Sequence, residues 1–180
     1  MKRIAALIGL VLAAVTFVAA PASAATPYCG VRWGSLTKSA PGMSSPPLVN
    51  VRAGRHACYD RVVLDVAGPA SGYTVRYVTQ VRDQGKGDVV LVRGGARLEV
   101  VALLPAYDIN TGAVTYHPAN RSEVVNVTGY RTLRQIAWAG SFAGYTSIGV
   151  GVRARRPFRV FVLSGPRSAS RLVVNVAHRW

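Results

Sequence analysis

The sequence is poor in acidic residues, histidine and cysteine, and each shortage excludes a class of function. Against 22 lysines and arginines, the 180 residues include only seven aspartates and glutamates, three histidines and two cysteines. So few scattered acids offer little material for the paired carboxylates of a glycoside hydrolase. His56, His117 and His178 are about 61 residues apart, without the short spacing of metal ligands or a local catalytic motif. We therefore expect no enzymatic activity, no bound metal and no cofactor.

One short segment contains the residues of a nucleophile elbow in the wrong order. In Gly140-Ser141-Phe142-Ala143-Gly144 the serine follows the first glycine directly. The Gly-x-Ser-x-Gly spacing that exposes a serine hydroxyl is therefore absent. We predict a turn between two strands here.

The positive charge of the chain is large and consists almost entirely of arginine. The formal net charge is +15 and the isoelectric point is about 11.1. A surface of this charge attracts polyanions. The sequence contains no basic helix and no base-stacking motif, so we expect no specific nucleic-acid partner, although non-specific binding follows from the charge alone.

The first 24 residues have the three parts of a secretory signal peptide. Lys2 and Arg3 precede an apolar run from Ile4 to Ala20, and the small-residue exit Pro21-Ala22-Ser23-Ala24 follows. The alternative is a retained membrane anchor, but the run is rich in alanine and ends at once in an Ala-x-Ala site. We predict a signal peptide over 1–24, cleavage after Ala24, secretion to the cell wall or medium, and no transmembrane anchor in the mature chain.

Export makes the two cysteines interpretable as a pair. Outside the cytoplasm, Cys29 and Cys58 are more plausible as a disulfide than as a metal or redox site. Residues 25–48 are rich in proline, serine and glycine and show no apolar period. We predict an extended N-terminal segment over 25–48, tied by the disulfide to one domain over 49–180.

The sequence pattern over 49–180 predicts an all-β domain. Short runs rich in valine and isoleucine alternate with glycine, proline, asparagine and aspartate, and apolar residues do not return at helical spacing. Eight to nine short strands at this spacing favour a small two-sheet β-sandwich or a closed barrel. The predicted strands are Arg61 to Val66, Tyr73 to Val81, Val89 to Val92, Arg97 to Leu104, Val124 to Val127, Gln135 to Ala139, Ser147 to Val152, Phe158 to Leu163 and Arg171 to Val176.

Two of these strands have similar sequences, and their shared pattern resembles that of a known family. Arg61 to Ala67 reads Arg-Val-Val-Leu-Asp-Val-Ala, and Arg171 to Ala177 reads Arg-Leu-Val-Val-Asn-Val-Ala. Any two buried strands can look alike, or the fold has two related halves. The pattern of arginine, three apolar residues, aspartate and an apolar residue resembles the opening and closing strands of AMIN and AMIN-like domains, with Asn175 in place of aspartate.

Further phrases of the AMIN-like secreted proteins of actinobacteria follow in the same order, between Val51 and His178. They are Tyr59 to Val63, Gly72 to Val78, Arg155 to Val160 and Leu163 to Pro166. The resemblance implies a two-sheet β-sandwich without catalysis of its own. In the AMIN family such domains lie beside cell-wall amidases and secretion pores and target them to the envelope by holding peptidoglycan. We expect no attached catalytic domain here, and therefore a separate protein or the wall itself as partner.

The densest group of arginines is the candidate ligand-binding site. Arg153, Arg155, Arg156 and Arg159 fall within seven positions around a turn. A guanidinium group pairs with carboxylate or phosphate in two places at once, and wall polymers supply both groups. We expect these four arginines to bind peptidoglycan or another anionic wall polymer; the alternative is a solvated basic surface that only supports solubility.

The competing functional hypothesis is a secreted protein-interaction module. In that case an exposed apolar or aromatic patch docks an envelope or extracellular protein. Salt distinguishes the two hypotheses, because a contact made by charge weakens at high ionic strength and an apolar interface persists. Trp138 is expected in the core rather than in such a patch.

Expression of the full chain in a secreting bacterial host tests the signal peptide. We expect the protein recovered outside the cytoplasm to begin at Ala25, because signal peptidase cleaves after small residues at this spacing. Intact mass spectrometry and N-terminal sequencing measure this directly. Full-length chain held in the membrane fraction would instead support a retained anchor.

Overall fold

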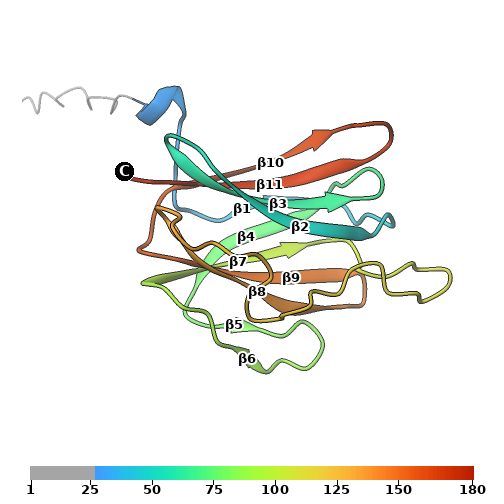
Figure 1. The fold of residues 1–180 in the computed structure, drawn as a ribbon. Helices are drawn as coiled ribbons and strands as arrows, with labels where there is room; N and C mark the ends of the chain where they lie inside the picture. Colours follow the sequence, from blue (N-terminus) through green and yellow to red (C-terminus); the bar gives the residue numbers. More distant parts are fainter. Residues whose placement is uncertain (1–26) are drawn as a thin grey trace, which may run out of the picture.

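A computed structural model describes residues 27–180, and the predicted signal peptide over 1–24 lies outside these residues. The described chain forms two antiparallel sheets packed face to face, as predicted, with a small third sheet on one side (Figure 1). The larger sheet has the order β1-β4-β7-β9-β8, the second β10-β11-β3-β2, and the third β5-β6. The strands are β1 (Lys38–Ala40), β2 (Leu48–Arg55), β3 (Tyr59–Val66), β4 (Tyr73–Val78), β5 (Val81–Arg82), β6 (Val89–Val90), β7 (Ala96–Ala102), β8 (Leu133–Phe142), β9 (Tyr145–Val152), β10 (Phe158–Ser164) and β11 (Ser170–Ala177).

Alternate residues of the strands form the core between the two main sheets. In β3, Val62, Leu64 and Val66 are buried there, and β11 contributes Leu172 and Val174 in the same way. Successive side chains of a strand point to opposite faces, so Arg61, Asp65 and Asn175 belong to the other face. Trp138 is buried in this core, as expected.

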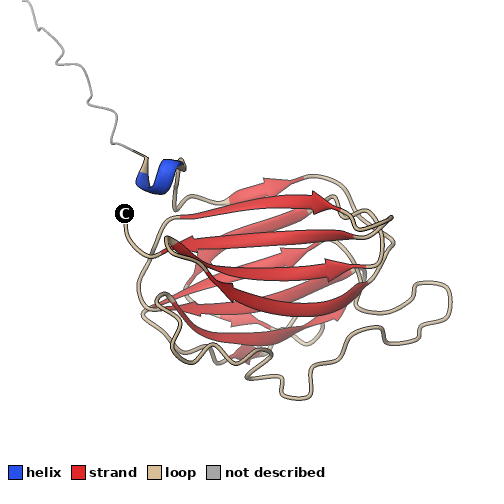
Figure 2. Cartoon of the chain, turned by 45° about the horizontal axis from the view of Figure 1, so that its top comes forward, coloured by secondary structure: helices blue, strands red, loops and turns tan. Residues whose placement is uncertain are grey.

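The two outer faces of the sandwich differ. On the five-stranded sheet, Val81 and Val92 pack with Ala137 and Ala139 in a second, smaller core under the β5-β6 sheet. A side chain at Gly151 would meet the carbonyl oxygen of Arg93, so this close approach requires glycine. In Figure 2 the sheet of β10, β11, β3 and β2 faces the viewer, and no further described strand or helix covers it.

The N-terminal segment joins both sheets along one edge. A 3-10 turn (Tyr28–Gly30) contains Cys29, which forms the predicted disulfide with Cys58 in the β2–β3 turn. Gly34 then bridges to Phe158 at the start of β10, and β1 pairs with β4 of the other sheet. The segment therefore passes from one sheet to the other and contributes a short strand.

Most predicted strands are present, but the one over Val124 to Val127 is wrong. This run lies between turns in which the side chains of Asn120 and Asn126 accept backbone N–H groups. Val124 donates one backbone hydrogen bond to Ile136, and Val127 is buried as part of a loop. Short polar side chains that bond their own backbone compete with strand pairing.

The turn predicted at Ser141 is confirmed. Ala143 and Gly144 connect β8 to β9 with φ of 49° and 81°, the conformation of a two-residue hairpin turn. The Ser141 hydroxyl accepts the Ala106 N–H at 2.9 Å and hydrogen-bonds the Thr146 hydroxyl, so it has a structural role. No helix of residues 27–180 is long and apolar enough to cross a membrane.

Removal of the disulfide tests how the N-terminal segment is held. We expect Cys29→Ser/Cys58→Ser to lower the free energy of unfolding by about 3 kcal/mol, because the unfolded chain regains the freedom of a loop this long. Urea unfolding followed by tryptophan fluorescence measures the change. Reductant should destabilise the wild type and leave the variant unaffected; a variant as stable as the wild type would contradict the prediction.

Candidate ligand-binding face

The two similar segments, Arg61 to Ala67 and Arg171 to Ala177, lie side by side in the four-stranded sheet. β3 and β11 pair antiparallel with Val63 opposite Val173, which places Arg61 opposite Asn175 and Asp65 opposite Arg171. The arginine of each strand therefore faces the fifth residue of the other motif. The two copies of the repeated motif are therefore related by a local two-fold axis in space.

The two ends of this arrangement differ chemically. Asp65 is held by Arg52, whose guanidinium donates two hydrogen bonds of 2.8 and 3.0 Å. Arg61 has only the neutral Asn175 opposite, and donates from Nε to Asn175 Oδ1 at 2.8 Å. The half of the face around Asn175 thus carries an arginine whose charge no carboxylate neutralises.

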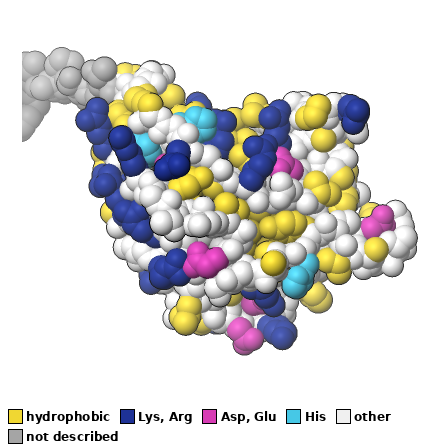
Figure 3. All heavy atoms as spheres, in the orientation of Figure 1, with side chains coloured by type: hydrophobic (Ala, Val, Ile, Leu, Met, Phe, Trp, Pro, Cys, Tyr) yellow, Lys and Arg dark blue, Asp and Glu magenta, His cyan; other side chains and the backbone are white. Residues whose placement is uncertain are grey.

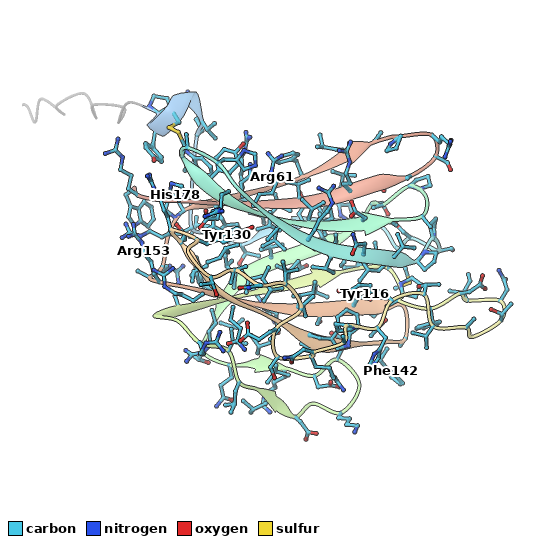
Figure 4. The ribbon with its side chains drawn as sticks, in the orientation of Figure 1. Arg61, Tyr116, Tyr130, Phe142, Arg153 and His178 are labelled. Carbon is cyan, nitrogen blue, oxygen red and sulfur yellow. A yellow bond between two sulfur atoms is a disulfide. The ribbon has the colours of Figure 1, made fainter. Side chains whose placement is uncertain are left out.

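Aromatic rings support the guanidinium groups on this half of the face. Arg159 lies over Phe161 at 4.9 Å and over Trp33 at 5.8 Å from the ring centroids. Arg61 lies over Tyr59 and Phe161 at 5.4 and 5.9 Å. We name this surface the arginine–aromatic face; it extends outward from the four-stranded sheet on which Figure 4 labels Arg61. Its residues are Trp33, Tyr59, Arg61, Arg159, Phe161 and Asn175.

Several N–H donors of the sheet's outer side have no acceptor. Asn175 is fully buried, and while its Oδ1 accepts from Arg61, its Nδ2 has no hydrogen-bond partner among residues 27–180. The Nε groups of Arg159 and Arg171 are likewise buried without a partner. Buried donors without acceptors are costly, so this face favours a ligand that supplies oxygen acceptors.

His56 borders the face and stacks on Tyr59 with 4.5 Å between ring centroids. Partial burial and then the positive charge of Arg61 lower the pKa of His56 below its ordinary value, although Asp60 acts in the opposite direction. The ring is therefore neutral at pH 7 and extends the aromatic surface.

The four predicted ligand-binding arginines do not converge on one site. Only Arg159 belongs to the arginine–aromatic face. Arg153 lies at the end of the sandwich near His178 (Figure 4), and its guanidinium donates to the His178 carbonyl. Arg155 lies over Tyr77 at 4.8 Å and donates to the Ser35 carbonyl.

Arg156 contributes mainly through its backbone. Its N–H donates to the Tyr77 hydroxyl at 2.9 Å and its carbonyl accepts from the same hydroxyl at 2.6 Å. Burial raises the pKa of Tyr77 above its ordinary value, more than Arg156 and Arg155 lower it. The phenol therefore stays protonated and fixes the turn before β10.

The acids of the chain are mostly taken up by structural contacts. Asp65 and Glu99 form salt bridges with Arg52 and Arg76. Figure 3 shows dark blue side chains gathered at the end where the N-terminus leaves, with few magenta acids on this side. Among residues 27–180 no three His, Cys, Asp or Glu side chains group as metal ligands.

Sequence reasoning missed Trp33 and Tyr59 as functional candidates. The only signal for this face in the sequence was the motif shared by the strands that contain Arg61 and Asn175. Nothing local indicates that Trp33, in a segment rich in small and polar residues, lies beside β10, since that contact depends on the Gly34 bridge to Phe158.

Comparison with models of protein families matches residues 46–178 to the family described as AMIN-like domain. No curated protein and no solved structure matches the chain significantly. The matched range begins just before β2 and ends at His178, so it contains both main sheets except for β1.

A substitution at Asn175 tests the electrostatics of the face. We expect Asn175→Asp to raise the free energy of unfolding by about 1 kcal/mol, because the new carboxylate oxygen accepts from the neighbouring guanidinium groups. Asn175→Leu, which removes the Arg61 acceptor, should lower it by a similar amount. Thermal unfolding at low and high salt measures both; equal destabilisation by the two substitutions would contradict the account.

Proposed function

The chain belongs to the AMIN-like domain family, and we propose that it is an exported, non-catalytic cell-envelope protein that binds peptidoglycan or another anionic wall polymer. Membership marks it as a module related to the cell envelope. The proposal assigns the contact to the arginine–aromatic face. Of the four arginines that the sequence singled out, it retains Arg159 for this contact.

The chemistry of peptidoglycan matches the groups on the face. Its glycan carries N-acetyl carbonyl oxygens, and its peptide stems carry carboxylates. Arg61 and Arg159 offer planar donor forks to such oxygens, and these forks are held over rings rather than over acids. Trp33 and Tyr59, with ring centroids 5.9 Å apart, add flat apolar area for a sugar ring.

One observation carries the proposal: the unpartnered amide nitrogen of the fully buried Asn175. It lies in the strand between Arg61 of β3 and Arg159 of β10. All three side chains present N–H donors, and only Asn175 Oδ1 accepts. A carbonyl or carboxylate oxygen that enters between the guanidinium groups gains several donors at once.

A specific observation also favours the alternative, a secreted protein-interaction module. Several large apolar side chains are exposed outside the face, foremost Leu91 at 84% and Leu36 at 76%. Phe142, at the opposite end of the sandwich from His178 (Figure 4), is exposed at 59%. Exposed apolar side chains that lie together in a patch are typical of protein interfaces.

Co-sedimentation with purified insoluble peptidoglycan, with and without attached anionic polymer, tests the proposed function. We expect Arg61→Gln/Arg159→Gln to reduce retention at least threefold, because the substitution removes both forks, and retention of the wild type to weaken as salt rises. A matched control, Arg82→Gln/Lys86→Gln, loses the same charge on the β5-β6 hairpin and should be retained like the wild type.

An unrelated protein of equal charge provides the second control. Equal retention of that protein, or equal loss in both double variants, would reduce the contact to non-specific charge and overturn the proposal. Retention that persists at high salt and survives Arg61→Gln/Arg159→Gln would favour the interaction module instead.

A further inference from the structure

A second basic site lies at the end of the sandwich that holds the disulfide and the C-terminus. A cleft of about 810 Å³ opens there, beside Cys29, Cys58 and His178. Figure 4 shows Arg153, Tyr130 and His178 together at this end, away from Tyr116 and Phe142. We name it the arginine cleft, and its walls include Tyr28, Tyr130, Arg131, Arg134, Arg153 and Arg179.

The charge of the arginine cleft is unopposed. Four guanidinium groups line it and no aspartate or glutamate does. Among the described residues, the four aspartate or glutamate salt bridges to arginine use Arg52, Arg76, Arg93 and Arg121, none of which belongs to the cleft. Like charges held around one cavity repel one another, so an anion that enters it relieves that repulsion.

Backbone contacts and an aromatic ring hold three of the four arginines in place. Arg134 donates to the carbonyl oxygens of Tyr130 and Leu133 at 3.1 and 2.8 Å. Arg153 donates to the carbonyl of His178, and Arg179 lies 4.7 Å from the centre of the Tyr28 ring. Groups fixed in this way lose little freedom when they bind a ligand.

A buried carboxylate holds His178, one of the residues that line the cleft. Asp60, exposed at 1%, accepts from the N–H groups of Thr132 and Leu133 at 2.6 and 3.0 Å and contacts His178 Nε2 at 3.1 Å. His178 Nδ1 contacts the Ala57 carbonyl at 3.2 Å, next to Cys58. Both oxygens of Asp60 thus have partners inside the protein, and among the described residues Asp60 forms no ion pair with an arginine of the cleft.

We propose that the arginine cleft binds the phosphate or pyrophosphate group of an organic phosphate. Phosphate brings two charges and three free oxygens, whereas a carboxylate brings one charge and two oxygens, so phosphate better satisfies four guanidinium groups. The volume lies in the range of small-molecule sites and exceeds that of a bare ion. Tyr28 and Tyr130 flank the space for the organic part.

Isothermal titration calorimetry with sodium pyrophosphate tests the proposal, with acetate at equal ionic strength as the reference anion. We expect saturable binding of pyrophosphate and at least a tenfold weaker affinity in Arg131→Gln/Arg153→Gln. Arg131 makes no side-chain hydrogen bond or ion pair among the described residues, so Arg131→Gln alone should fold normally and still weaken binding. Arg153→Lys keeps the positive charge but loses the planar fork, so its affinity for pyrophosphate should lie between those of the wild type and of Arg131→Gln/Arg153→Gln.

The matched control is again Arg82→Gln/Lys86→Gln, which should bind pyrophosphate like the wild type. Unfolding temperatures without ligand show that each variant is folded. Absence of binding, binding no tighter than that of acetate, or equal weakening in the control would overturn the proposal.

A free organic phosphate and a phosphodiester polymer both supply phosphate oxygens, although the diester brings only one charge and two free oxygens per phosphate. Glycerol 3-phosphate and poly(glycerol phosphate) distinguish them in the same titration, since the polymer gains affinity per phosphate only if the cleft accepts a chain. Peptidoglycan retention should be unchanged in Arg131→Gln/Arg153→Gln, because Arg61 and Arg159 do not line the cleft. Failure of the phosphate-binding proposal therefore does not contradict the wall-binding proposal, and failure of the wall-binding proposal does not contradict phosphate binding.

Discussion

The buried carboxylate of Asp60 joins three parts of the fold that are distant in the sequence. It lies in β3, accepts N–H groups at the start of β8 and contacts His178 just after β11. Because β8 belongs to one main sheet and β3 and β11 to the other, this one group ties both sheets together at the disulfide end. Removing a partner from such a contact leaves buried polar groups unsatisfied, which makes the interaction costly to lose. The arginine cleft is built on top of it.

The pairing of β3 with β11 has the same importance for the arginine–aromatic face. Its register, with Val63 against Val173, decides that Arg61 meets Asn175 and that Asp65 remains for Arg52. A slip of one residue would turn these polar side chains into the core, so the apolar alternation on the inner side fixes the register. The surface chemistry of the sheet is thus a consequence of its core. The two proposed sites have different origins: a repeated strand motif underlies one, and the meeting of loops around Asp60 underlies the other.

Much of the architecture could be predicted because its signals are local. The alternation in β9, β10 and β11 identifies strands, and the two-residue turn at Ala143 and Gly144 is indicated by glycine between two apolar runs. β2 was missed although its apolar residues alternate with Asn50, Arg52 and Gly54, as is typical of a half-buried strand. The run at Val124 was misinterpreted because Asn120, just before it, and Asn126, within it, form local turns. In that run, side chains that bond nearby backbone groups outweighed the strand preference of valine. For the site, the sequence pointed to arginine as the chemistry but grouped Arg153, Arg155, Arg156 and Arg159 by their nearness along the chain.

The sequence by itself determined the all-β class, the disulfide pair and the family motif, since each depends on residue type and short spacing. Only the tertiary structure decided which arginines lie together. Neighbours along a strand point to opposite faces and a turn redirects the chain, so Arg153 and Arg159 separate while Arg159 meets Trp33. Likewise Asp60 and His178 are 118 residues apart, and their contact exists because β3 and β11 are neighbours in the sheet. The separation of two residues along the chain does not indicate such contacts, which form only when the sheets assemble.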